Sequence, residues 1–417
     1  MTIQAKRTAA DYSLLDPAVQ SAPYEFYDVL REEAPVYQVP ENGMFVVTRY
    51  EDVRTVLLDT ETFSSDFDFV EEMLGERDRH YNGVIARDGW AFVSGLQRSD
   101  PPIHSRHRAV VDEIFNIRRV KALVPRITRL ADALIDAFID RGECDFIEEF
   151  ALPFPGTIIA EQLGLGSGDL KTFKAWSNAS KAPLQRALTD EQLAEAARQV
   201  VEMQKFLEQR VEERRREPRD DLISVLVNTQ TGDGEPLSMH ELQAILRQLM
   251  TGGFDTVTNS LANGLWLLLR YPDQLAKLRA RPELVNGFIE EALRFETPVQ
   301  GLLRRTTRDV EMAGTTIPKG AIVIPRYGAA NRDPDKFACP HAFDIERKNA
   351  SAHLGFGFGI HFCVGRPLAR TELQIAFSRL IARLKDISLA RPLPVPPHAP
   401  SLMFHPMAEL KIRFQGG

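Results

Sequence analysis

The chain has 417 residues, of which 44% are apolar and 26% charged, so its composition is that of a globular protein and not of a collagen-like, low-complexity or disordered one. Its formal charge of −7 gives no global reason to expect binding to nucleic acid. The sequence has no run of about 18 apolar residues, and its first 30 residues contain no apolar core of the length expected in a signal peptide. Three scattered cysteines suit neither a disulfide framework nor a four-cysteine zinc site. We therefore expect a soluble, cytoplasmic protein without a membrane anchor.

Helical periodicity dominates the chain, and strand patterns are short. Apolar residues spaced by three and four before Gly142 predict an amphipathic helix, and Ser238 with Glu241 has the spacing of a capping box before a long central helix. The expected helices cover residues 127–138, 191–216, 242–269 and the segment from after Cys363 to about Leu384. The expected strands cover residues 44–48, 310–312, 321–325 and 409–414. Since no repeat and no long flexible linker is visible, we predict one mainly α domain with small β-sheets over residues 1–417.

The central helix contains a pair of glycines in its middle. Gly252 and Gly253 each cost about 1 kcal/mol relative to alanine in a helix, and Asp255 and Thr256 follow them. One explanation is close packing of a second helix, with Thr256 bonded one turn back and Asp255 at the surface. The other is a ligand against the glycines, with the acid and the alcohol admitting water and relaying protons. Both explanations stay open at this point.

The third cysteine lies in a glycine-rich loop, FGFGIHFCVG, at residues 356–365. Its glycines permit close approach to a flat ligand, Phe356 can pack beside the sulfur, and the helix that follows lowers the pKa of a thiol at its start. This stretch resembles the haem-binding loop of the cytochrome P450 family. The resemblance implies a P450-like helical fold around a buried haem b, with the Cys363 thiolate as the proximal iron ligand. We expect Cys144 and Cys339 to be inert buried residues.

A second motif fits the same family. Glu291 and Arg294 resemble its Glu-x-x-Arg pair, which joins a third residue, Arg347 here, in a structural brace for the haem loop. Taken alone, such a pair is common on solvated helix surfaces and is worth only a few tenths of a kcal/mol. In order with Cys363 along the chain, the three residues support the resemblance.

Basic residues in family-like positions are implied as partners of the haem propionates. His104 and Arg108 match a His-x-x-x-Arg helix start, Arg304 follows the bracing helix with Arg305 as its rival, and His361 stands two residues before the cysteine. Considered singly, each could be an ordinary surface charge. The cofactor-binding residues implied by the resemblance are His104, Arg108, Gly253, Arg304, Phe356, Gly357, His361, Cys363 and Gly365.

The central glycines resemble the oxygen-activating segment of the family, which implies that Asp255 and Thr256 are the catalytic proton-delivery groups. Helical geometry predicts one substrate-facing stripe on this helix, with Gln248 at its margin. A glutamine at a helix margin is more often solvated or core-capping than a substrate contact. The candidate pocket residues are Trp90, Phe92, Val93, Gln248, Leu249, Gly252, Val299, Leu302, Met403 and Phe404, each equally plausible as core.

The resemblance implies a haem-thiolate monooxygenase that uses O2 to hydroxylate or O-demethylate a small to medium hydrophobic substrate. Electrons are expected from a ferredoxin and its reductase, or from a flavodoxin-type donor, because no flavin or iron–sulfur motif is left in the chain. A basic cluster is a candidate docking patch for the donor, with a solvated surface as the alternative. Its residues are Arg118, Arg119, Lys121, Arg126, Arg366 and Arg370. A peroxide-driven haem peroxygenase and a non-catalytic haem-binding sensor are the competing functions, and we expect a monomer.

Overall fold

The computed structural model describes residues 7–67, 75–164, 170–184, 188–231, 234–393 and 397–416. The chain divides into two compact units. The first unit consists of Met1–Ser64, Pro125–Ala151 and Thr256–Gly417, and the second of Ser65–Val124 and Leu152–Asp255. One integrated domain over residues 1–417 remains a prediction.

The first unit contains the strands. Its helices are α1 (Pro17–Ser21), α2 (Tyr24–Glu33), α3 (Tyr50–Leu58), α13 (Pro272–Ala280), α14 (Val285–Phe295), α15 (Tyr327–Ala330) and α16 (Arg366–Arg383). Its strands are β1 (Val36–Gln38), β2 (Phe45–Val47), β3 (Phe63–Ser64), β4 (Glu143–Asp145), β5 (Arg304–Thr306), β6 (Val310–Met312), β7 (Thr315–Ile317), β8 (Ile322–Pro325), β9 (Leu384–Leu389) and β10 (Lys411–Gly416). They form a five-stranded sheet in the order β1-β2-β8-β5-β3, a three-stranded sheet β4-β10-β9 and the hairpin β6-β7.

The five-stranded sheet and α3 share an apolar core. Phe45 on β2 stands opposite Val323 on the parallel neighbour β8, and both are buried with Val53 of α3. This core also fixes the cysteine loop, because a Cβ at Gly359 would lie 2.6 Å from the backbone oxygen of Leu57 at the end of α3. Only glycine fits that approach. The end of α3 therefore constrains the loop at Gly359.

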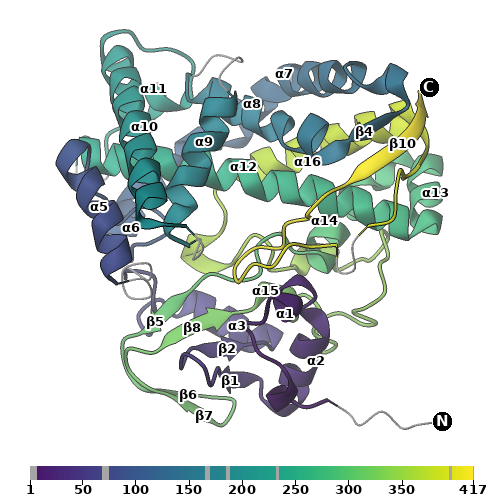
Figure 1. The fold of residues 1–417 in the computed structure, drawn as a ribbon, viewed down its shortest axis with the longest axis horizontal. Helices are drawn as coiled ribbons and strands as arrows, with labels where there is room; N and C mark the ends of the chain where they lie inside the picture. The colour runs from purple at the N-terminus through teal and green to yellow at the C-terminus, as the bar shows by residue number, and fades with distance from the viewer. Residues whose placement is uncertain are drawn as a thin grey trace. The chain divides into compact units, whose positions relative to one another are not determined.

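The second unit is helical in its described residues. Its helices are α5 (Glu76–Asp88), α6 (Ile103–Ile114), α8 (Pro153–Gln162), α9 (Leu170–Lys181), α10 (Asp190–Arg216) and α11 (Leu222–Asn228). Helices α5, α9 and α11 pack against α10 (Figure 1). Helices α7 (Ile117–Asp136) and α12 (Met239–Arg270) run through the points at which the chain passes between the units.

The predicted fold class, mainly helical with small sheets, is confirmed. Helix α12 begins after the capping box, in which the Ser238 amide donates to the Glu241 carboxylate at 2.8 Å. The chain leaves the helical segment before β4 through Gly142, which has a φ of +69°. Strands β1, β3, β4, β5, β7 and β9 were not predicted, because all of them except β9 have three residues or fewer, too few to display alternation. In the described ranges, no helix is long and apolar enough to cross a membrane.

Candidate active site

The loop around Cys363 is held in a narrow set of backbone conformations. Gly357 and Gly359 have φ values of +72° and +70°, a left-handed region that glycine adopts without strain. The amide of Cys363 donates to the carbonyl oxygen of Phe356 at 2.9 Å, and α16 begins directly after the loop. The loop therefore folds back on itself in front of a helix N-terminus, where partial positive charge favours an anion such as a thiolate.

The three cysteines differ in exposure. Cys363 is exposed, whereas Leu354 and Leu368, which bracket its loop, are buried. Cys144 on β4 is buried as expected, and burial raises the pKa of its thiol to about 12. The expectation that Cys339 is buried was wrong: it is exposed, in a bend where its φ is +49°. Cys363 alone among the three combines exposure with a position before a helix.

A partly buried charge network lies against the first turns of α16. The Arg370 guanidinium forms two hydrogen bonds of 2.6 Å with the carboxylate of Glu290 on α14, and His353 approaches the same carboxylate at 3.3 Å. Burial alone would raise the pKa of Glu290, but hydrogen bonds from His353 and Arg370 outweigh it and hold the pKa at about 2. Arg370 also lies 4.9 Å from the Phe356 ring centre. The sequence analysis missed this network and assigned Arg370 to a docking patch.

The three residues of the predicted brace lie together. Arg294 and Glu291 on α14 pair at 2.7 and 2.8 Å with both side chains fully buried, and Arg347 reaches the same carboxylate at 3.1 Å. Arg294 also donates to the carbonyl oxygens of Asn331 and Pro340. This cluster ties α14 to the segment that precedes the cysteine loop.

Two of the predicted propionate partners lie in the first unit. Arg304 on β5 is only 2% exposed, and its guanidinium donates to the carbonyl oxygen of Leu303 at 2.9 Å. Its rival Arg305 is the more exposed of the two. His361 closes a short 3₁₀ turn, Gly359–His361, that leads into the cysteine. A buried guanidinium requires an anionic or polar environment, so the burial of Arg304 favours it over Arg305.

The other two predicted propionate partners lie in the second unit, on α6. His104 is 2% exposed, and burial, followed by the neighbouring Arg108 charge, lowers its pKa. Arg108 is half-buried and donates to Asp112, one turn later, at 2.8 Å. The sequence did not indicate this helical ion pair as a partner of Arg108.

Asp255 has a cationic partner that the sequence analysis did not find. The Lys181 ammonium, at the end of α9, forms an ion pair with the Asp255 carboxylate on α12, and both side chains are about 30% exposed. Thr256 is the next residue, and its carbonyl oxygen accepts a hydrogen bond from Ser260 at 2.7 Å. Asp255 is therefore neither a free surface acid nor a buried one.

The paired glycines of α12 are not required by helix packing. A Cβ built at Gly252 meets no described atom within 4 Å, and one at Gly253 meets Ile159 of α8 at an ordinary 3.6 Å. Close packing occurs at Gly156 instead, where a Cβ would lie 2.6 Å from the Phe254 ring. Gly252 is also exposed. Close packing of a helix from this unit therefore does not account for the glycine pair, and a ligand against the glycines stays a prediction.

Several predicted pocket residues of the second unit are occupied by protein contacts. Trp90 exchanges backbone hydrogen bonds with the Gln204 side chain and donates its indole N–H to Glu208 at 3.3 Å. Gln248 accepts the amide of Gln97 at 3.1 Å, which fits the core-capping alternative. The remaining candidates are Phe92, which is half-buried under the Arg247 guanidinium, Val93, which is 38% exposed, and Leu249, which is buried.

The pocket candidates of the first unit form one structure. Val299 and Phe404 pair across an antiparallel bridge, and the amide of Gln300 donates to the carbonyl oxygen of Met403 at 2.7 Å. Leu302 is partly buried against the core of the five-stranded sheet. Val299, Met403 and Phe404, which are about 100 positions apart in the sequence, thus form one partly exposed apolar wall.

Comparison with known proteins decides the family. The cytochrome P450 family model matches residues 173–406. Cytochrome P450 107B1 of Saccharopolyspora erythraea is 38% identical over 390 residues, which cover 91% of this chain and 92% of that protein. The 6-deoxyerythronolide B hydroxylase of the same organism is 38% identical over 368 residues, covering 88% and 89%. The solved structure of cytochrome P450 CYP109Q5 from Chondromyces apiculatus has 32% identity, a TM-score of 0.84 and coverage of 97% and 98%.

The chain belongs to the cytochrome P450 family. As a P450 it is an oxidoreductase, a monooxygenase of organic substrates, which confirms the predicted family, fold and enzyme class.

The P450 family implies a haem cofactor, and the residues present fit one. In the first unit, the Cys363 thiol is exposed on a loop whose flanking residues are buried. Thiolate sulfur is a proximal haem ligand in P450 enzymes. Arg304, in the same unit, is a buried basic group of the kind that a propionate needs.

Proposed function

We propose that this P450 binds haem b through the Cys363 thiolate and inserts one atom of O2 into a small to medium hydrophobic substrate, by hydroxylation or O-demethylation. In the hydroxylation, a substrate C–H, O2, two electrons and two protons give a C–OH and water. The observation that carries the proposal is the exposed thiol of Cys363 on a constrained loop in front of α16. Bound haem would supply the iron at which dioxygen is reduced.

The protein's own chemical task is to deliver protons. Asp255 and Thr256 are adjacent on α12, next to glycines that leave the helix surface without side chains. The Asp255 carboxylate can accept a proton from water and pass it to the Thr256 hydroxyl, and Lys181 determines how far the carboxylate is committed to an ion pair. The Thr256 hydroxyl would hold that proton beside the glycines of α12, where a bound haem would supply the redox chemistry.

The remaining predicted residues hold the cofactor and the substrate. We assign Arg304, His361, His104 and Arg108 to the propionates, and Gly253, Phe356, Gly357 and Gly365 to the faces of the macrocycle. The wall made by Val299, Met403 and Phe404 contacts the substrate in this proposal.

We infer that a ferredoxin and its reductase, or a flavodoxin-type donor, supply the electrons. An acidic donor is attracted by basic side chains that are not neutralised. Arg119 pairs with Asp220 at 2.9 Å and Arg370 with Glu290, so an ion pair already compensates part of the charge of each of these two side chains. We place the enzyme in the cytoplasm as a monomeric, single-domain protein.

Isotope labelling tests the function. Haem-loaded protein is supplied with ¹⁸O2, ferredoxin, its reductase and a panel of terpenes, aromatic acids, steroids and fatty acids. Product that carries one ¹⁸O atom supports the monooxygenase. Turnover that requires only hydrogen peroxide would assign the peroxygenase reaction, and the absence of any ligand that displaces iron-bound water would assign the sensor.

A further inference from the structure

A cluster of buried polar side chains lies in the first unit outside all predicted site residues. Asn263 comes from α12, Glu296 follows α14, and His398 and His405 come from the segment between β9 and β10. All four are at least 94% buried. Buried groups of this kind are retained only with satisfied hydrogen bonds.

The contacts of Asn263 fix the protonation of one ring. Its amide nitrogen donates to the backbone oxygen of His405 at 3.2 Å, so its side-chain oxygen faces Nε2 of His398 at 3.1 Å. Nε2 of His398 must therefore carry the hydrogen. Burial lowers the pKa of His398 to about 3, which keeps this ring neutral. The ring stacks on that of His405 at 3.6 Å between centres.

His405 in turn serves a buried carboxylate. Its Nε2 lies 3.1 Å from Oε2 of Glu296, which also accepts the Tyr24 hydroxyl at 2.8 Å, and Oε1 accepts Arg332 at 3.2 Å. Burial would raise the pKa of Glu296, but the His405 hydrogen bond and the Arg332 charge hold it at about 2. The charged carboxylate thus depends on His405 as a donor.

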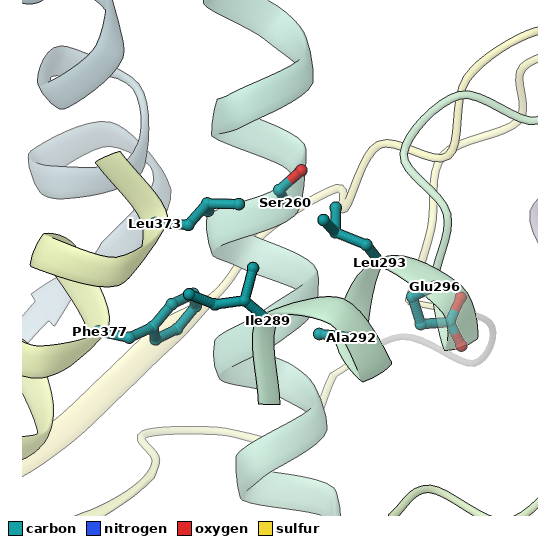
Figure 2. A pocket seen from close by; sticks show the side chains of 7 residues that line it. All are labelled: Ser260, Ile289, Ala292, Leu293, Glu296, Leu373 and Phe377. Atoms are coloured by element: carbon teal, nitrogen blue, oxygen red, sulfur yellow. The ribbon is translucent and has the colours of Figure 1, made fainter. Parts of the chain in front are cut away.

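Glu296 also borders a small cavity between α12, α14 and α16. The cavity has a volume of about 10 Å³, room for one water at most, and apolar side chains such as Phe377 form most of its wall. Figure 2 shows the Glu296 carboxylate pointing away from the other lining side chains. The Glu296 carboxylate therefore belongs to the histidine cluster and not to the apolar cavity.

Two histidines and a carboxylate also have the chemistry of a metal site, and their ligand atoms lie within 4.8 Å of one another. Both oxygens of Glu296 are already occupied by Tyr24, His405 and Arg332. The two rings are within 20° of parallel, so the lone pairs in their planes do not converge on one ion. The arrangement is that of a hydrogen-bonded cluster.

The cluster fixes the hairpin that carries part of the substrate wall. His398 pairs with Met407 across an antiparallel bridge, and the amide of His405 donates to the carbonyl oxygen of Pro298 at 3.0 Å. Between these points the chain turns through Met403 and Phe404. A shift of either histidine therefore changes the position of Met403 and Phe404 relative to residues 298–300.

We propose that His405, with Glu296, His398 and Asn263, is a positioning cluster that determines which bulky ligands the wall of Met403 and Phe404 accepts. This inference rests on the proposed function in one respect, that the wall faces the substrate. His405 touches neither substrate nor cofactor in this account and acts through the hairpin.

The test compares a small and a large haem ligand in the ferric holoprotein. His405→Leu removes the donor to Glu296, His405→Gln retains one, and His80→Leu alters an exposed histidine as a control. We expect His405→Leu to weaken 4-phenylimidazole binding by about tenfold relative to imidazole, which is too small to reach the wall. His405→Gln and the control should stay within about twofold of the wild type.

A second readout needs no haem. Hydrogen–deuterium exchange of the peptides that contain Gln300 and His405 should accelerate in His405→Leu, while peptides of α16 keep their protection. If His405→Leu does not accumulate, His398→Phe keeps the stacked ring, removes the donor to Asn263 and carries the same two measurements.

The outcomes separate the two proposals. An unchanged ratio of the two ligand affinities in folded variants would overturn the positioning role, as would a Zn²⁺-induced loss of 4-phenylimidazole binding that His398→Phe abolishes. Wild-type holoprotein without a thiolate-ligated haem spectrum would instead contradict the proposed function, and the exchange measurement would still report on the cluster.

Discussion

Two charge clusters of this P450 contrast in burial. Glu291, Arg294 and Arg347 form a network in which the central pair is fully buried and both arginines also donate to backbone carbonyl oxygens. Asp255 and Lys181 form one ion pair, and each side chain is about 30% exposed. Both clusters contain a motif residue of the family, yet only the first is built into the core.

The contrast separates structural from chemical roles. Breaking a buried ion pair leaves an uncompensated charge and costs about 3–5 kcal/mol, whereas a part-exposed pair contributes about 0–1 kcal/mol. A carboxylate that must exchange protons with water needs the second environment, because a fully satisfied buried network holds its charge state. Stability should therefore depend on the brace, and proton delivery on Asp255.

The largest expected effect is on the brace. Arg294→Leu leaves Glu291 buried without its main partner and should lower the free energy of unfolding by about 3–5 kcal/mol, measured by urea denaturation. The exposed pair Glu212 and Arg215 on α10 supplies the control, since Glu212→Gln should change stability by less than about 0.5 kcal/mol. Equal losses of unfolding free energy in the two variants would show that burial does not distinguish these two ion pairs.

The network behind the cysteine loop adds a pH dependence. The pKa of Glu290 in the folded protein, about 2, lies below its usual value of 4.5, so its stabilising effect is complete above that value and is lost as pH falls toward 2. Between pH 6 and pH 3 the stability difference between wild type and Glu290→Gln should shrink by about 2 kcal/mol. A difference independent of pH would show that Glu290 is not held as a carboxylate.

In helix α12, adding a single methyl group at a glycine separates a structural position from a predicted ligand-binding one. Gly264 packs against α16, where a Cβ would lie 2.6 Å from the Phe377 ring, so Gly264→Ala should destabilise the protein by about 1–3 kcal/mol. Gly252→Ala meets no such neighbour and should raise stability by up to about 1 kcal/mol while weakening ligand binding. Thermal unfolding and imidazole titration of both variants measure the two effects. Destabilisation by Gly252→Ala would restore the packing explanation.

The smallest effect on stability is expected at the part-exposed ion pair of Lys181 and Asp255. Lys181→Met and Asp255→Asn should each change the free energy of unfolding by less than about 1 kcal/mol. Product formation should nevertheless fall by roughly 10²-fold in Asp255→Asn, because the carboxylate that relays protons is gone. The fraction of electrons that is lost to by-products instead of product should be smaller in Lys181→Met than in Asp255→Asn. Turnover with unchanged coupling in Asp255→Asn would exclude this residue from proton delivery.

The sequence predicted local features well and distant partners poorly. The cysteine loop, the Glu291–Arg294 pair of the brace and the glycines of α12 are recognisable because spacing within one segment carries their chemistry. Lys181 escaped detection because it lies 74 residues from Asp255, and Glu290 lies 80 residues from Arg370. Only folding brings such partners together. The His405 cluster was missed for the same reason, since its four residues come from three segments that are distant in the sequence.

The central claim, ligation by Cys363, is tested most directly by the visible spectrum of the reduced protein under carbon monoxide. The exposed Cys339 offers a matched control, since Cys339→Ser changes a thiol that no predicted site uses. We predict the red-shifted thiolate–iron–carbonyl band in wild type and Cys339→Ser and its loss in Cys363→Ala. Haem-loaded Cys363→Ala that keeps the band would contradict the account.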